Sequence, residues 1–315
     1  MKSVFLTLAI LMIGFFQGVE AKTPSPSTHY TLHTTHSNNK KPPTTKEKTM
    51  IRNPGNLGAF YPASCGEIER MIAHWNGILD EALKDRNILE AKPRAIIAPH
   101  AGYIYSGFTA NIAHRILGNA RPERVVVIGP SHHVYFEGIS VGLQDRYPTP
   151  CGELAIDRSY AEELARRFGL SFVPEAHDKE HSTETQMPFI RHYEPGAKVV
   201  ELIYGRIDYT ELVPILEALL ADPGTAVVIS SDLSHFYTLE QAKRLDEICL
   251  AGVANEDLAT LDRGCEACGI LGIKALVAVA KEHGWKTQLL DYRTSADASG
   301  DTQQVVGYMS AIVTE

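Results

Sequence analysis

The sequence predicts a single α/β domain over residues 51–315, with a central, mainly parallel sheet flanked by helices. Short runs rich in Val and Ile alternate along the chain with segments of helical periodicity. Such alternation is typical of helices packed on a sheet. Several of the apolar runs also stop at Pro or Ser and are followed at once by His or Asp, which is expected where strands end at a ligand-binding edge.

Each element follows from its local pattern. Strands are expected where β-branched residues concentrate, at 94–98, 125–129, 198–204, 226–230, 286–292 and 304–313. Helices are expected where apolar residues recur at helical spacing, near 66–85, 106–117, 158–168, 182–193, 209–221, 239–253 and 270–283. Residues 138–150 interrupt this pattern with an Ile-Ser-Val-Gly-Leu run and a Tyr-Pro-Thr-Pro turn, so they predict an antiparallel excursion.

The first 50 residues are predicted to lie outside the domain. Residues 1–21 combine Lys2, an apolar stretch and a small-residue site at Ala21, a pattern typical of a signal peptide. The stretch is shorter than the roughly 20 apolar residues of a spanning helix, although an uncleaved anchor is the alternative. Residues 22–50 are rich in Thr, Ser, Pro and Lys, which predicts a disordered tether.

These segments bear on where the protein works. A cleaved leader predicts export to the periplasm or the cell exterior, with no stable membrane insertion afterwards. A true start at Met50 would instead leave the protein in the cytoplasm. The whole chain has a formal net charge of −8 although residues 22–50 are basic, so the acidic excess lies in the domain. Nucleic acid is therefore not expected as a partner, because phosphate binding requires clustered Lys and Arg.

Polar side chains follow three of the predicted strands. His100 comes after the strand at 94–98, the His132-His133 pair after 125–129, and Asp232 and His235 after 226–230. The carboxyl ends of parallel strands meet at one edge of an open sheet, so these side chains are expected to lie together. Imidazoles and a carboxylate at that edge predict a metal site.

A further polar cluster precedes the helix predicted at 182–193. His181 lies at its expected N-terminus, and Glu184 falls in its first turn. Helix capping alone would explain so many polar groups. In the company of the other clusters, the two side chains are also candidates for orienting a metal ligand or a substrate.

The five cysteines allow several interpretations. Cys265 and Cys268 form a Cys-x-x-Cys motif, which is compatible with a redox dithiol. A structural disulfide between some pair of cysteines is the alternative, although all five cannot pair. Cys249 lies in a helical pattern and is expected to be a small buried apolar residue.

Taken together, these motifs resemble the Memo family, whose bacterial and archaeal members are often called AmmeMemoRadiSam system protein B. The resemblance runs in order from about Met50 to the C-terminus. The motifs that carry it are Phe60-Tyr61-Pro62-Ala63, Ala98-Pro99-His100-Ala101-Gly102-Tyr103, Gly129-Pro130-Ser131-His132-His133, Glu180-His181-Ser182 with Glu184, Ser230-Ser231-Asp232-Leu233-Ser234-His235 and Cys268-Gly269.

The resemblance implies a fold similar to the class III nonheme iron dioxygenases and a redox metal, iron or copper. Carried over by motif, the implied metal ligands are His100, His132 and Cys268, with Asp232 and His235 beside the metal. Family members usually begin near the position of Met50 and are cytosolic, so the leader and tether depart from the family pattern.

Three functions remain open from the sequence. The first is a metal-dependent oxidoreductase that acts on a small-molecule substrate. The second is a non-catalytic protein that handles a metal, taking it from a donor or passing it to an acceptor, or that binds peptides. A thiolate ligand favours Cu(I) or Zn over Fe(II), and zinc with an activated water would give the third, a hydrolase with Asp232, His235 or Glu184 as base.

Overall fold

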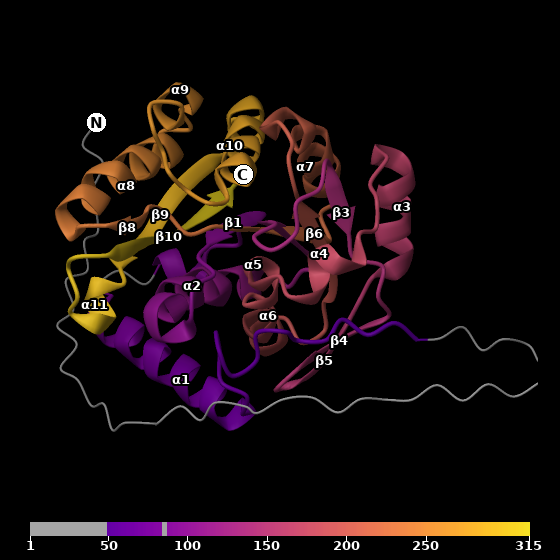
Figure 1. Cartoon of the computed structure of the whole chain (residues 1–315), viewed down its shortest axis with the longest axis horizontal. Helices are drawn as coiled ribbons and strands as arrows, with labels where there is room; N and C mark the ends of the chain where they lie inside the picture. The colour runs from indigo at the N-terminus through magenta and orange to yellow at the C-terminus, as the bar shows by residue number, and fades with distance from the viewer. Residues whose placement is uncertain (1–48, 84–86) are drawn as a thin grey trace, which may run out of the picture.

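An eight-stranded mixed sheet runs through the centre of the protein, in the order β3-β6-β2-β7-β1-β10-β8, with β9 paired to β10 (Figure 1). The computed structural model describes residues 49–83 and 87–315, so the predicted signal peptide and nearly all of the predicted tether lie outside it. The strands are β1 (Ala95–Ala98), β2 (Arg124–Pro130), β3 (Ile139–Val141), β6 (Lys198–Tyr204), β7 (Thr225–Ser230), β8 (His235–Tyr237), β9 (Lys286–Thr294) and β10 (Val305–Thr314).

The centre of the sheet is parallel. Strands β6, β2, β7 and β1 are neighbours that run in one direction, with β3 antiparallel beside β6 and β10 antiparallel beside β1. A separate hairpin of β4 (Arg146–Thr149) and β5 (Gly152–Ala155) follows β3 in the chain. The predicted α/β class is confirmed, and the excursion predicted near 138–150 consists of β3 and this hairpin.

Helices cover both faces of the sheet (Figure 1). One face packs against α1 (Cys65–Ala82), α2 (Tyr103–Leu117) and α6 (Met187–Tyr193). The other packs against α3 (Arg158–Phe168), α7 (Val213–Leu220), α8 (Leu239–Ala254) and α10 (Ile270–His283). The short helices are α4 (Pro174–Asp178), α5 (His181–Glu184), α9 (Leu258–Leu261) and α11 (Ala296–Ser299), and 3-10 turns occur at Asn87–Glu90, Gly118–Ala120 and Tyr209–Glu211.

The parallel strands are apolar throughout because both of their faces are buried. Successive side chains of a strand point to opposite faces, and in β1 Ile96 joins the core on the α1 and α2 side while Ile97 joins the core on the α7 and α10 side. Both side chains are fully buried. Strands of this kind form continuous Val- and Ile-rich runs rather than alternating ones, which is why they were predictable from the sequence.

The helix predicted over 182–193 is interrupted in the structure. Helix α5 ends at Glu184, and α6 begins at Met187 with Pro188 in its first turn. Proline has no backbone N–H to donate to the carbonyl four residues earlier. Gln186, in the break, uses its side-chain amide to donate to the Pro99 carbonyl and to Ser230 Oγ, which ties the break to the ends of β1 and β7.

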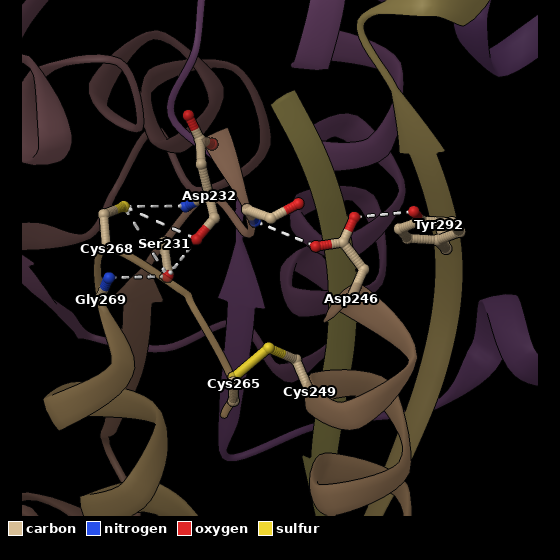
Figure 2. The surroundings of a disulfide bond; sticks show 9 residues. Ser231, Asp232, Asp246, Cys249, Cys265, Cys268, Gly269 and Tyr292 are labelled. Atoms are coloured by element: carbon tan, nitrogen blue, oxygen red, sulfur yellow. Dashed lines mark hydrogen bonds between the residues drawn. A yellow bond between two sulfur atoms is a disulfide. The ribbon is translucent and has the colours of Figure 1, made fainter. Parts of the chain in front are cut away.

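Four of the five cysteines form disulfides. Cys65 at the start of α1 is bonded to Cys151 in the β4–β5 turn, and Cys249 of α8 is bonded to Cys265 (Figure 2). The expectation for Cys249 is therefore wrong in one respect, because it is buried but cross-linked. The Cys-x-x-Cys dithiol does not form, since Cys265 pairs with Cys249 and Cys268 remains free. Within the described ranges, no helix combines the length and apolar character needed to cross a membrane.

Candidate metal centre

Three histidines meet at the carboxyl edge of the parallel strands. His100 follows β1, His132 follows β2 and His181 opens α5. One potential ligand atom from each ring lies within 4.8 Å of the others, and the ring centroids of His132 and His181 are 4.5 Å apart. The structure thus brings together two predicted ligands, His100 and His132, with His181, which the sequence indicated only as an orienting residue.

Glu180 fixes the orientation of the His132 ring. Its Oε1 lies 2.8 Å from His132 Nδ1, and its Oε2 accepts the His132 backbone N–H at 2.6 Å. Burial alone would raise the pKa of Glu180, but its contacts with His132 and its bond from Ser182 N lower that pKa to about 2. An ionised carboxylate requires Nδ1 to donate, so Nε2 of His132 keeps a lone pair that can bind a metal.

His100 is oriented in the same way by Ser230. Its Nδ1 lies 3.0 Å from Ser230 Oγ, and the Ser230 hydroxyl in turn donates to the Ser182 carbonyl. Ser230 therefore accepts from His100, which leaves the Nε2 lone pair of His100 directed into the site. Burial, reinforced by the neighbouring His132, lowers the pKa of His100 to about 3. The ring is neutral at pH 7, the form that binds metals.

Cys268 borders this pair. Its Sγ lies 3.2 Å from His100 Nε2 and accepts the Asp232 backbone N–H, also at 3.2 Å. Burial, followed by the nearby Asp232 charge, raises the pKa of Cys268 well above its ordinary value. The thiol is therefore protonated and donates toward His100. Figure 2 shows the Cys268 sulfur directed toward Asp232, away from the disulfide. Loss of the thiol proton would leave a thiolate beside a free imidazole nitrogen.

Asp232 lies beside His100, and His235 is close enough to interact with it electrostatically. Asp232 Oδ1 accepts the backbone N–H of His100 at 2.7 Å, and the carboxylate is 4% exposed. Burial raises the pKa of Asp232 to about 6, against the opposing effect of nearby His235. A carboxyl group that titrates near neutrality can both accept and return a proton.

Glu184 lies among different partners. We call residues 52–61 the N-terminal strap, and Glu184 anchors it, since its oxygens accept from Gly55 N, Asn56 N and Tyr61 Oη at 2.8–2.9 Å. Arg52 adds a buried ion pair to the same carboxylate. The strap thus engages both oxygens of Glu184, and this residue is not one of the grouped potential metal ligands.

The strap borders the histidines. The Phe60 ring is 4.5 Å from the His181 ring, and the Phe60 carbonyl accepts the Tyr103 N–H. A cavity of about 440 Å³ lies beside it, lined by Asn53, Gly55, Asn56, His133, Asp178 and Lys179. His133 thus faces this cavity, while its neighbour His132 joins the histidine cluster. The cavity has room for a small molecule next to the candidate metal ligands.

A second cavity is lined in part by Ala101, which follows His100 in the chain. It has a volume of about 350 Å³, and its wall includes Ala101, Tyr105 and Tyr308. Tyr105 therefore lines a cavity, whereas Tyr103 is buried in the core. Sequence reasoning missed Glu180 as the partner of His132. The available signal was its position next to His181, in the polar cluster that precedes the helix.

Fold and site together define an α/β protein with a cluster of one buried, one partly buried and one exposed histidine at the carboxyl edge of a parallel sheet. Residues 52–312 match the sequence model of the Memo-like protein family, and the chain belongs to this family. MEMO1 family proteins of Archaeoglobus fulgidus and Aquifex aeolicus are each 31% identical to it over 83% of the chain, and that of Methanosarcina mazei is 32% identical over 84%. The matches cover 98–99% of these relatives, so the resemblance in the motifs is confirmed.

Proposed function

We propose that this Memo-like protein binds iron or copper and uses it in an oxidoreductase reaction on a small-molecule substrate. In the proposal, His100 and His132 supply two nitrogen ligands and Cys268 supplies an anionic one. The observation that carries it is the convergence of two imidazoles whose Nδ1 atoms are both engaged, by Ser230 and by Glu180. Such outer hydrogen bonds are typical of metal-binding histidines.

The surrounding residues would serve the chemistry in distinct ways. A bound redox metal would supply electron transfer with the substrate. Asp232, whose pKa is about 6, would take a proton from the substrate and return it with His235. His181 offers a further nitrogen toward the same space. Phe60 and the strap would restrict the entry of water from one side.

Metal handling without turnover is the second candidate function. It is supported by the Cys268 thiol, because a thiolate favours Cu(I) or Zn. In that case the partners would be a metal donor or acceptor rather than a substrate. A zinc hydrolase would use the same residues, with Asp232 as base, and its activity would persist without oxygen.

Metal content tests the proposal. The full chain is purified anaerobically, and the metals are measured by elemental mass spectrometry in wild type, His100→Ala, Cys268→Ser and His181→Ala. Near-stoichiometric iron or copper in wild type, lost in the first two variants, is the expected result. His133→Ala is the matched control, because this neighbouring side chain faces the cavity and should leave the metal in place.

The outcomes separate the candidates. If the metal is lost in His181→Ala but kept in Cys268→Ser, the third ligand is the His181 imidazole and not the Cys268 thiolate. Equal, negligible metal in wild type and variants would refute the metal proposal. Oxygen consumption by the loaded protein with small aromatic or thiol donors, abolished by His132→Ala, would support turnover, whereas tight binding with no consumption would support metal handling.

Export is also part of the proposal. Two disulfides support it, because such bonds persist in the periplasm or outside the cell and are rare in the cytosol. They leave only Cys268 of the five cysteines as a free thiol. The intact mass of the protein from its native host should match a chain that begins at Lys22. A mass that matches a chain beginning at Met50 would contradict export.

A further inference from the structure

A second group of potential metal ligands surrounds the Cys65–Cys151 disulfide. One atom each from Cys65, Glu69 and Cys151 lies within 4.8 Å of the others, and all three residues are partly exposed. Cys65 and Glu69 are four residues apart on α1, so they share one side of the helix. Cys151 reaches them from the β4–β5 turn. The group shares no residue with the histidine cluster.

The carboxylate in this group is held in place. Glu69 Oε1 lies 3.9 Å from Cys151 Sγ and 2.9 Å from Nδ1 of His192, which projects from α6. Helix α1 and the β4–β5 turn therefore meet at the two sulfur atoms, and a histidine from α6 orients the acidic side chain. Hydrogen-bonded carboxylates of this kind are typical of metal ligands.

The other disulfide provides a comparison within the same chain. Cys249 belongs to the apolar core and is fully buried, and Cys265 packs against that core. Among the described residues, no His, Asp or Glu completes a ligand group with this pair. A disulfide that only cross-links has no need of a carboxylate and an imidazole, so the surroundings of Cys65–Cys151 call for a different explanation.

We propose that Cys65, Glu69 and Cys151 form a zinc site when their disulfide is reduced. Zn²⁺ accepts both thiolates and carboxylates, and three protein ligands leave a fourth position for water. The reductant is a dithiol: it is oxidised to its own disulfide while the Cys65–Cys151 bond takes up two electrons and two protons. Zinc binding then releases these two protons as the thiols become thiolates. His192 holds Glu69 toward the metal.

The partial exposure of the Cys65–Cys151 disulfide makes its reduction possible. A partly exposed disulfide is open to attack by a thiolate, whereas a buried one is protected. Oxidised, the pair cross-links α1 to the β4–β5 turn; reduced, the same side chains would keep the two elements joined through the metal. The protein would thus retain this connection in both redox states, and zinc would be bound in only one of them.

The experiment uses the full chain with the His100→Ala and Cys268→Ser substitutions, which silence the proposed histidine site. Zn²⁺ is titrated against a chromophoric chelator before and after treatment with dithiothreitol. We expect no bound zinc in the oxidised protein and one equivalent after reduction. With Co²⁺ in place of zinc, the reduced protein should show thiolate-to-cobalt absorption. No gain of zinc on reduction would overturn the proposal.

Two variants guard against zinc bound loosely by an unfolded, reduced chain. Glu69→Gln leaves both cysteines in place and should weaken zinc binding about tenfold or more, whereas loose binding by thiols alone would not change. The double substitution of Cys249→Ala and Cys265→Ala is the matched control, and it should preserve the gain on reduction. A gain that survives Cys65→Ser, or that disappears in the control, would also refute the assignment.

Discussion

Replacing Glu180 by Gln tests the orientation of the histidine site. The two Glu180 oxygens accept three N–H groups, those of His132 N, His132 Nδ1 and Ser182 N, at 2.6–2.9 Å. Glutamine has a single acceptor oxygen, so at least one N–H is left facing the amide nitrogen. Such a buried, unpaired donor costs about 1–3 kcal/mol. Loss of a partner outside the ligands weakens metal binding about 10–100-fold, which is about 1.4–2.7 kcal/mol.

The assay is competition for Fe²⁺ or Cu⁺ against a calibrated chelator under anaerobic conditions, together with urea unfolding of the metal-free protein. Glu194→Gln is the matched control. Glu194 is also a buried glutamate, but neither of its oxygens has a hydrogen-bond partner among the described residues, and burial raises its pKa well above the ordinary value. Because Glu194 is not among the grouped potential metal ligands and does not bond to any of them, the Glu194→Gln variant should bind metal like wild type. Unchanged metal affinity in Glu180→Gln would refute the orienting role of this carboxylate.

Three further predictions concern stability. Arg52 forms ion pairs with two buried carboxylates, so Arg52→Met leaves their charges uncompensated and should lower the free energy of unfolding by about 3–5 kcal/mol. The control Arg244→Met, at an exposed site, should change it by less than about 0.5 kcal/mol. Equal effects of the two substitutions in urea titrations would contradict this. Burial lowers the pKa of His114 to about 4. Because the unfolded chain takes up this proton near pH 6.5, stability should fall from pH 6.5 toward pH 4, by about 3 kcal/mol in total, and an equally steep loss in His114→Gln would show that another group is responsible. Removing the Cys249–Cys265 disulfide, which spans 16 residues, should cost about 3 kcal/mol, and an unfolding midpoint that is unchanged in Cys249→Ala, Cys265→Ala would disprove it.

Much of the fold was predictable because local pattern and burial agree. The parallel strands are buried on both faces, so their apolar runs stand out, and His100, His132 and Asp232 could be placed because each follows the end of such a run. The direction of β10 was not predictable in this way. Its ten residues are as apolar as a parallel strand, yet they pair antiparallel with β1.

The remaining parts of the site depend on contacts between distant residues. Glu184 is 128 residues from Asn56, to which it is bonded, so no local signal distinguishes a strap anchor from a catalytic carboxylate. Cys65 and Cys151 are 86 residues apart, and spacing alone does not select pairs among five cysteines. The broken helix at Pro188 was a local signal, and it marks the point where Gln186 reaches the ends of two strands.

The position of β10 in the sheet has a consequence for biosynthesis. Strand β10 pairs with β1, β8 and β9, so the sheet cannot close before residues 305–314 have left the ribosome. Until then β1 has an open edge and β9 has no partner in the sheet. This part of the hydrophobic core therefore forms late, only after β10 has been synthesised, although β1 is made early.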